Sequence, residues 1–221
     1  MEFMMMRLVS IIMMCVCLGM EAQTLKLQGS TVQDIVPDGW QHVEAQGDLN
    51  KDGIIDLVVV VTPDFEENCK SREDGYVYNF NQPILAIYFG TNQGEMHLWK
   101  KYDNVIPADE SEFCRHETGL EITTRGTLLI SNQLSCSAGS YGTSENTYTY
   151  RYQGGDFYLI GFDQEELQRN TGEYNVISEN YLTWKRQVKK SNMFDESVPV
   201  TEKWSKLSKK PLEKLGDIWC E

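Results

Sequence analysis

The chain has 221 residues, of which 41% are hydrophobic and 24% are charged, close to the averages of soluble globular proteins. This composition excludes a wholly disordered chain, a fibre and a polytopic membrane protein. A net charge of −13 repels phosphate backbones, so no nucleic acid partner is expected, and the same field attracts cations.

Residues 1–22 have the pattern of a secretory signal peptide. Arg7 precedes an apolar stretch over residues 8–18, and a short segment of small and polar residues follows and ends at Ala22. Signal peptides combine a basic start, an apolar segment of about 7–15 residues and a small residue at the cleavage site. The apolar stretch is shorter than the roughly 20 residues that a transmembrane helix needs. We therefore predict an exported, periplasmic or secreted chain of residues 23–221 without a transmembrane segment.

Four cysteines remain after this cleavage: Cys69, Cys114, Cys136 and Cys220. An even number in an exported chain indicates two disulfides, for which three pairings exist, with free thiols as the alternative. Cys69 and Cys114 lie in polar, acid-rich segments, so we expect them to pair, which leaves Cys136 to join Cys220. No Cys-x-x-Cys spacing indicates zinc. The two leader cysteines follow large residues, so a lipid anchor is not expected.

Strand patterns dominate the chain after residue 40. Apolar runs over residues 57–61, 84–89 and 127–130 are bounded by Gly, Pro or Asn, which is typical of buried strands. Residues 96–102 form the return strand after a Gly-rich turn, and a further hairpin is centred on residues 125–126. These patterns predict a mainly β fold of antiparallel sheets, with about eight to ten strands and one or two short helices.

A tyrosine-rich hairpin over residues 147–162 is the clearest pair of strands. Its central Gly-Gly pair suits the positive φ angles of hairpin turns. If Tyr152 faces Phe157, strict alternation places Tyr148 on the same face as Phe157, and Phe162 on the opposite face. Both faces are aromatic, so we expect packing on each side of this hairpin. A tyrosine stripe that binds a sugar or a peptide is the alternative.

Helical patterns are short. A turn or short helix is expected within residues 34–42, a capping pattern occurs at residues 163–166, and the apolar spacing of residues 212–219 suits one or two helical turns. Residues 64–81 have no period and predict a surface loop. The lysine-rich tail over residues 191–221 is expected to dock on its own domain.

The most specific pattern is the nine-residue segment from Asp48 to Asp56. Asp48, Asn50, Asp52 and Asp56 occupy relative positions 1, 3, 5 and 9, glycine occupies position 6, and Ile54 at position 7 offers its carbonyl. Such alternate oxygens converge when a loop curls, and Ca²⁺ takes six to eight oxygen ligands at about 2.3–2.6 Å. The segment therefore predicts a calcium site, with magnesium less favoured. A run of Asx-turns without a metal is the alternative.

This loop leads into a strand, whereas an EF-hand would need Glu at position 12, which is Val59 here. Residues 47–60 (GDLNKDGIIDLVVV) resemble the FG-GAP or VCBS-type repeat, also found in integrin α-chain propellers. Residues 85–94 (LAIYFGTNQG) resemble the strand and Phe-Gly turn that follow in that repeat. The resemblance covers residues 40–104 and implies one calcium ion, held in a β-hairpin loop by the five residues named above.

A closed propeller is not expected, because it needs about four to eight blades and the chain contains one Asp-rich loop. We predict a propeller-blade-like or sandwich-like single domain over residues 23–221. It would comprise the repeat-like half, a Tyr-rich meander over residues 118–190 and the basic tail. The second half is similar to that of small exported bacterial proteins that carry one such repeat, and this similarity implies architecture alone.

Patterns that indicate catalysis are weak. His42, His97 and His116 have no metal-binding spacing, and Ser140 lacks the Gly-x-Ser-x-Gly context of a nucleophile elbow. We therefore expect a calcium-stabilised module that binds a protein or glycan partner or has a structural role. A hydrolase that acts on polymers outside the cytoplasm and an inhibitor or immunity-type protein are the alternatives.

Overall fold

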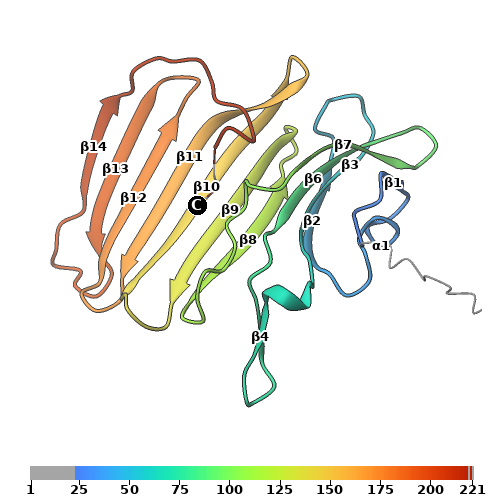
Figure 1. Cartoon of the computed structure of the whole chain (residues 1–221). Helices are drawn as coiled ribbons and strands as arrows, with labels where there is room; N and C mark the ends of the chain where they lie inside the picture. Colours follow the sequence, from blue (N-terminus) through green and yellow to red (C-terminus); the bar gives the residue numbers. More distant parts are fainter. Residues whose placement is uncertain (1–22, 219, 221) are drawn as a thin grey trace, which may run out of the picture.

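The computed structural model describes residues 23–218 and Cys220, so the predicted signal peptide lies outside the described residues. Within them the chain forms two antiparallel sheets, a small two-stranded hairpin and one short α-helix (Figure 1). This confirms the mainly β class. The described residues form fourteen strands, more than the predicted eight to ten, and three of the fourteen have only two or three residues. No helix in this part of the chain is long and apolar enough to cross a membrane.

The smaller sheet has five strands in the order β1-β7-β6-β3-β2. Its strands are β1 (Gln28–Gly29), β2 (Gln41–Gly47), β3 (Asp56–Thr62), β6 (Ile84–Gly90) and β7 (Met96–Tyr102). The central strands β3 and β6 are buried on both faces, as their continuous apolar runs predict. On one face, Val59 and Ala86 pack against the helix α1 (Val32–Ile35); on the other, Val58 and Leu85 join the core shared with the larger sheet.

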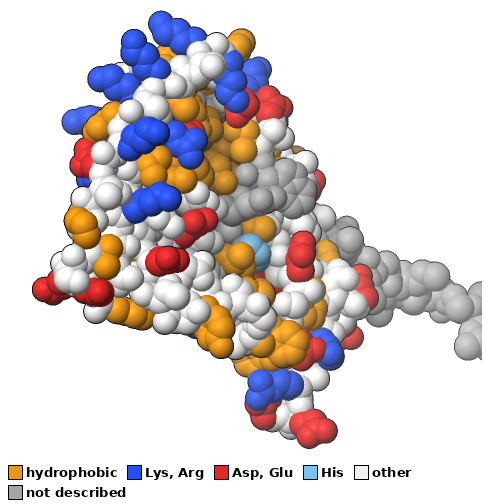
Figure 2. All heavy atoms as spheres, turned by 90° about the vertical axis from the view of Figure 1, so that its left-hand side faces the viewer, with side chains coloured by type: hydrophobic (Ala, Val, Ile, Leu, Met, Phe, Trp, Pro, Cys, Tyr) orange, Lys and Arg blue, Asp and Glu red, His pale blue; other side chains and the backbone are white. Residues whose placement is uncertain are grey.

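The larger sheet is a curved, open meander of seven strands, in which each strand pairs with the next along the chain (Figure 1). Its strands are β8 (Cys114–Ile122), β9 (Thr127–Cys136), β10 (Gly142–Gln153), β11 (Asp156–Gln168), β12 (Glu173–Asn180), β13 (Lys185–Asn192) and β14 (Thr201–Lys206). The edge strand β8 lies beside β2 of the smaller sheet, whereas β14 forms the opposite edge. Figure 2 looks toward that edge and shows Lys and Arg side chains gathered on its upper part.

The tyrosine-rich hairpin has the predicted turn, and Tyr152 faces Phe157 across it. The register then shifts at a bulge beside Thr149, so that Tyr148 faces Phe162 and their rings lie 5.0 Å apart. The prediction that Phe162 lies on the opposite face was therefore wrong, because strict alternation does not anticipate a bulge. The face that carries Tyr148 and Phe157 is buried in the shared core, and the other face is half-exposed.

The predictions for residues 163–166 and 64–81 also differ from the structure. Residues 163–166 lie inside β11, where pairing with strands on both sides outweighs their helical capping pattern. The loop over residues 64–81 contains a 3-10 turn (Glu66–Asn68) and a hairpin of β4 (Cys69–Ser71) and β5 (Val77–Asn79), which projects from the body of the protein (Figure 1).

The segment after β14 returns to the larger sheet in an extended conformation rather than as a helix. The backbone N–H of Leu159 donates to the carbonyl of Glu213, and the N–H of Leu215 donates to the carbonyl of Phe157, both at 2.9 Å. These bonds occupy the part of β11 that β12 does not reach. Leu215 is only 2% exposed and lies in the shared core, so the tail completes the packing between the two sheets.

Leu215→Ala should therefore lower the free energy of unfolding by about 2–5 kcal/mol, as expected for a buried leucine whose removal leaves a cavity. Urea denaturation followed by circular dichroism measures this change. Leu182→Ala is the matched control, because Leu182 is 46% exposed, and its effect should stay within about 0.5 kcal/mol. Equal effects of the two substitutions would contradict a core role for the tail.

Candidate metal centre

The Asp-rich loop connects the antiparallel strands β2 and β3, whose last facing pair is Gly47 and Asp56. Two of its residues have left-handed backbone angles: Lys51 with φ of 65° and Gly53 with φ of 84°. Glycine adopts this conformation at little cost, so Gly53 allows the chain to reverse direction within a few residues.

Asp48, at the start of the loop, binds the backbone of the residues that follow it. One carboxylate oxygen accepts hydrogen bonds from the N–H groups of Lys51 at 2.7 Å and Asp52 at 3.2 Å. The other oxygen accepts the N–H of Gly53 at 3.0 Å. The carboxylate therefore fixes the curl of the loop from its first residue.

Asn50 and Asp52 extend the same arrangement. Asn50 Oδ1 accepts the N–H of Asp52 at 2.9 Å, and Asp52 Oδ1 accepts the N–H of Ile54 at 2.8 Å. The Asn50 amide also donates to Asp52 Oδ2 at 3.0 Å. These are contacts of the Asx-turn type. Because carboxylate and amide oxygens carry two lone pairs, an oxygen that accepts a single hydrogen bond keeps one free for a cation.

Asp56 is completely buried, and it ties the loop to the neighbouring strand β6. One of its carboxylate oxygens accepts the N–H of Leu49 at 2.8 Å, and the other accepts the N–H of Gly90 at 3.0 Å. Burial raises the pKa of the Asp56 carboxyl, and the negative charge of Asp52 raises it further. The two N–H groups favour the ionised form and therefore reduce this rise.

No ion pair within the described residues balances the acidic side chains of the loop. The ion pairs found among the described residues lie elsewhere, and none includes Asp48, Asp52 or Asp56. Within residues 23–218 and Cys220, no group of three or more His, Cys, Asp or Glu side chains is assembled as a metal site. The loop thus holds three carboxylates within nine residues, and their side chains bind backbone N–H groups.

Two glycines outside the loop allow other segments to approach it closely. A Cβ atom on Gly126, in the turn between β8 and β9, would lie 2.5 Å from the carbonyl oxygen of Asp48. A Cβ atom on Gly90 would lie 2.2 Å from the carbonyl oxygen of Ile55. Sequence analysis identified both glycines as turn residues, but the contact with the loop depends on the tertiary arrangement.

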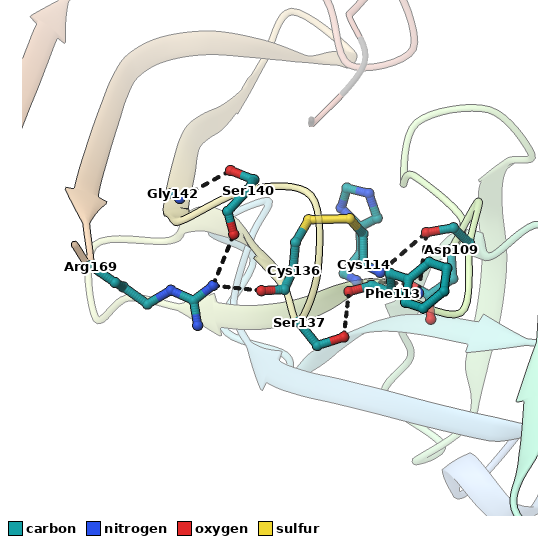
Figure 3. Close-up of a disulfide and its surroundings, with 10 residues drawn as sticks. Asp109, Phe113, Cys114, Cys136, Ser137, Ser140, Gly142 and Arg169 are labelled. Atoms are coloured by element: carbon teal, nitrogen blue, oxygen red, sulfur yellow. Dashed lines mark hydrogen bonds between the residues drawn. A yellow bond between two sulfur atoms is a disulfide. The ribbon is translucent and has the colours of Figure 1, made fainter.

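The disulfide joins Cys114 to Cys136, so the predicted pairs Cys69–Cys114 and Cys136–Cys220 were wrong (Figure 3). Cys114 and Cys136 face each other across β8 and β9, in the same register that pairs Ile122 with Leu128 beside the turn. A two-residue turn at residues 125–126, as the sequence predicts, would place Cys114 opposite Ser137. The observed register is one residue shorter on that side and places Cys114 opposite Cys136.

Hydrogen bonds surround the bridge and hold its two strand ends (Figure 3). The N–H of Ser137 donates to the carbonyl of Phe113 at 2.7 Å. Arg169 donates to the carbonyls of Cys136 and Ser140, at 2.5 and 3.2 Å, and so fixes the loop between β9 and β10. The bridge spans 22 residues, for which the chain-entropy model gives about 3 kcal/mol of stabilisation.

Cys69 and Cys220 are free thiols in different surroundings. Cys69 is half-buried, and its sulfur lies 3.7 Å from a carboxylate oxygen of Asp64. Cys220 is buried in the shared core, where its sulfur lies 3.6 Å from the hydroxyl of Tyr150. Burial raises the pKa of the Cys220 thiol to about 12, which makes it unreactive at neutral pH.

A separate hollow of about 330 Å³ brings together His42 on β2 and His116 on β8, which the sequence could not place side by side. Asp109 and Arg115 also line this hollow. The Asp109 carboxylate accepts the backbone N–H of His116 at 2.7 Å, while the His116 ring lies 3.0 Å from the amide of Asn132. Asp109 thus holds the backbone of His116, and the His116 ring is oriented by Asn132.

Comparisons of the chain with family models, curated proteins and solved structures give no match. The resemblance of residues 40–104 to the FG-GAP or VCBS-type repeat therefore stays a prediction from the sequence.

Asp56→Ala should lower the free energy of unfolding by about 1–3 kcal/mol even in excess chelator, because the buried N–H groups of Leu49 and Gly90 lose their acceptor. Urea denaturation in EDTA measures the effect without any contribution from a metal. An unchanged free energy of unfolding would contradict an anchoring role for this carboxylate.

Alkylation of the unfolded, unreduced protein should label two of the four cysteines after residue 22, because the other two are bridged. In the folded protein Cys69 should react and Cys220 should not, since its side chain is buried. Peptide mass mapping identifies the labelled positions. Four reactive thiols would contradict the bridge, and any other linked pair would contradict its connectivity.

Proposed function

We propose that the protein is an exported β module that binds one structural calcium ion and serves a binding or structural role toward a protein or glycan partner. The observation that supports the ion most directly is Asp56, a completely buried carboxylate without an ion-pair partner among the described residues. A buried charge is costly unless an opposite charge or a metal compensates it. The all-oxygen set of the loop suits a hard cation.

The ion would be held by the side chains of Asp48, Asn50, Asp52 and Asp56 and by the carbonyl of Ile54. It would neutralise three carboxylates. Without the ion, the repulsion between two carboxylates about 4 Å apart would cost about 4 kcal/mol at an effective dielectric constant of 20. Asp56 is the first residue of β3, one of the two strands of the smaller sheet that are buried on both faces. A cation at this position would therefore stabilise the core rather than take part in a reaction.

Removal of calcium should lower the melting temperature by several degrees, and its addition should restore it. Binding to the native state contributes about 2.7 kcal/mol when calcium is a hundredfold above its Kd. Differential scanning calorimetry in EDTA, in millimolar Ca²⁺ and in millimolar Mg²⁺ measures the shift and the metal preference.

Two variants separate specific binding from a general effect of acidic residues. Asp52→Ala should abolish the calcium response, because it removes a ligand from the loop, and should leave a folded protein. Asp74→Ala should retain the response, because Asp74 pairs with Arg72 in the turn between β4 and β5. A melting curve of the unchanged protein that ignores both chelator and calcium would favour the metal-free Asx-turn alternative.

The binding role is supported by the surface of the larger sheet. Its edge strand β14 is exposed along its whole length, and large apolar side chains are exposed on it (Trp204) and in the segment that precedes it (Phe194 and Val200). Affinity capture from envelope extract, together with a glycan array and a panel of polymer substrates, tests binding against catalysis. Turnover of any polymer would contradict a purely binding or structural role.

A further inference from the structure

The edge strand β14 has an open hydrogen-bonding side. In the described part of the chain, Thr201 to Lys206 pair with β13 alone, and all six residues are exposed. An exposed edge presents a row of backbone N–H and C=O groups to which a further strand can add. The other edge of this sheet, β8, lies beside β2 and is not open in the same way.

Basic residues surround this edge, although the protein as a whole is acidic. The strands β13 and β14 carry six bases and one acid: Lys185, Arg186, Lys189, Lys190, Lys203 and Lys206 against Glu202. Glu202 already accepts hydrogen bonds from the side chains of Gln187 and Trp204. The net charge of the chain is −13, so charge is strongly separated within the molecule.

The bases lie on both faces of the sheet at this edge. Lys206 faces Lys185 across the ladder, and Lys203 faces Val188. Because successive side chains of a strand point to opposite faces, Lys203 and Lys206 lie on different faces. Figure 2 shows the resulting cluster on the upper part of the protein.

We propose that the β14 edge binds an extended acidic segment of a partner protein, which adds to the larger sheet as an eighth strand. A strand in this position presents its side chains alternately to the two faces, so its acidic groups meet bases on both. Backbone groups of β14 supply the ladder, and the exposed ring of Trp204 supplies apolar contact. This proposal rests on the proposed binding role but not on the calcium site.

Two other occupants fit this edge less well. A second copy of the chain would bring β14 against β14, and the excess of bases on both edges would repel. An anionic membrane would attract the lysines, but it would leave the backbone groups of the edge without strand partners. Vesicle binding and sedimentation equilibrium distinguish these two occupants from an added acidic strand.

The probe is a short synthetic peptide of Glu, Val and Thr with Glu on both faces of the extended chain. Fluorescence anisotropy should detect binding at low salt, and the affinity should fall as salt screens the charges. The same peptide with N-methyl groups at alternate residues keeps its charge but cannot form the ladder, so it should bind at least tenfold more weakly. A Lys-containing peptide of equal length should not bind.

The charge reversal Lys203→Glu with Lys206→Glu should weaken binding of the acidic peptide at least tenfold, because it leaves four bases against three acids on β13 and β14 in place of six against one. The matched control is Lys26→Glu with Lys101→Glu, two exposed bases outside the larger sheet, which should bind like the unchanged protein. Circular dichroism confirms that both variants are folded.

No binding, or equal binding of the N-methylated peptide, would overturn the proposal. Stronger binding to phosphatidylglycerol-containing than to neutral vesicles, without any peptide binding, would also overturn it. So would a dimer in sedimentation equilibrium that the charge reversal strengthens, because a second copy would then occupy the edge. The measurements are made in Ca²⁺ and in EDTA. Peptide binding without a calcium response contradicts only the proposed calcium site, and a calcium response without peptide binding contradicts only this inference.

Discussion

The structure depends on one constraint, the burial of β3 and β6 on both faces. Continuous apolar runs cannot leave either side of the smaller sheet exposed to water. The helix α1 and Trp40 cover one side, and the concave face of the larger sheet, together with the tail, covers the other. The curvature of the larger sheet and the return of the tail therefore both enclose the shared core, which lies on the other face of the smaller sheet from the core under α1.

The Asp-rich loop lies at the end of this two-sided strand pair. Asp56 is the residue at which the polar loop passes into the apolar run, and it is buried as completely as the valines that follow it. Its bonds to the N–H groups of Leu49 and Gly90 connect the loop to β6. The proposed calcium ion would thus act where a charged segment and the core meet, and a change in the loop would be transmitted to the central strands.

Patterns confined to one segment predicted the fold class and most strands. The runs at residues 57–61 and 84–89, the Gly-Gly hairpin and the turn at residues 125–126 form the expected elements. The errors have a common physical origin in pairing between segments. The bulge beside Thr149 changes which face carries Phe162, and the hairpin register, rather than local polarity, decides the partner of Cys114.

The candidate loop could be predicted from spacing because its residues are contiguous, and the structure adds the burial of Asp56 and its bond to Gly90. The hollow with His42 and His116 could not be predicted, because it forms only where β2 and β8 lie side by side. The open edge of β14 likewise depends on strand order. Features made by one segment are visible in the sequence, whereas features made by two segments need the topology.

The position of the tail has a consequence for the order in which the protein folds. Residues 213–215 occupy part of β11, and Cys220 donates its N–H to the carbonyl of Val105, a partner 115 residues earlier in the chain. Contacts of such long separation form late, because the intervening chain must first be ordered. During synthesis, the shared core therefore stays incomplete until residue 220 has emerged, and the partly folded chain exposes apolar surface that a chaperone would recognise.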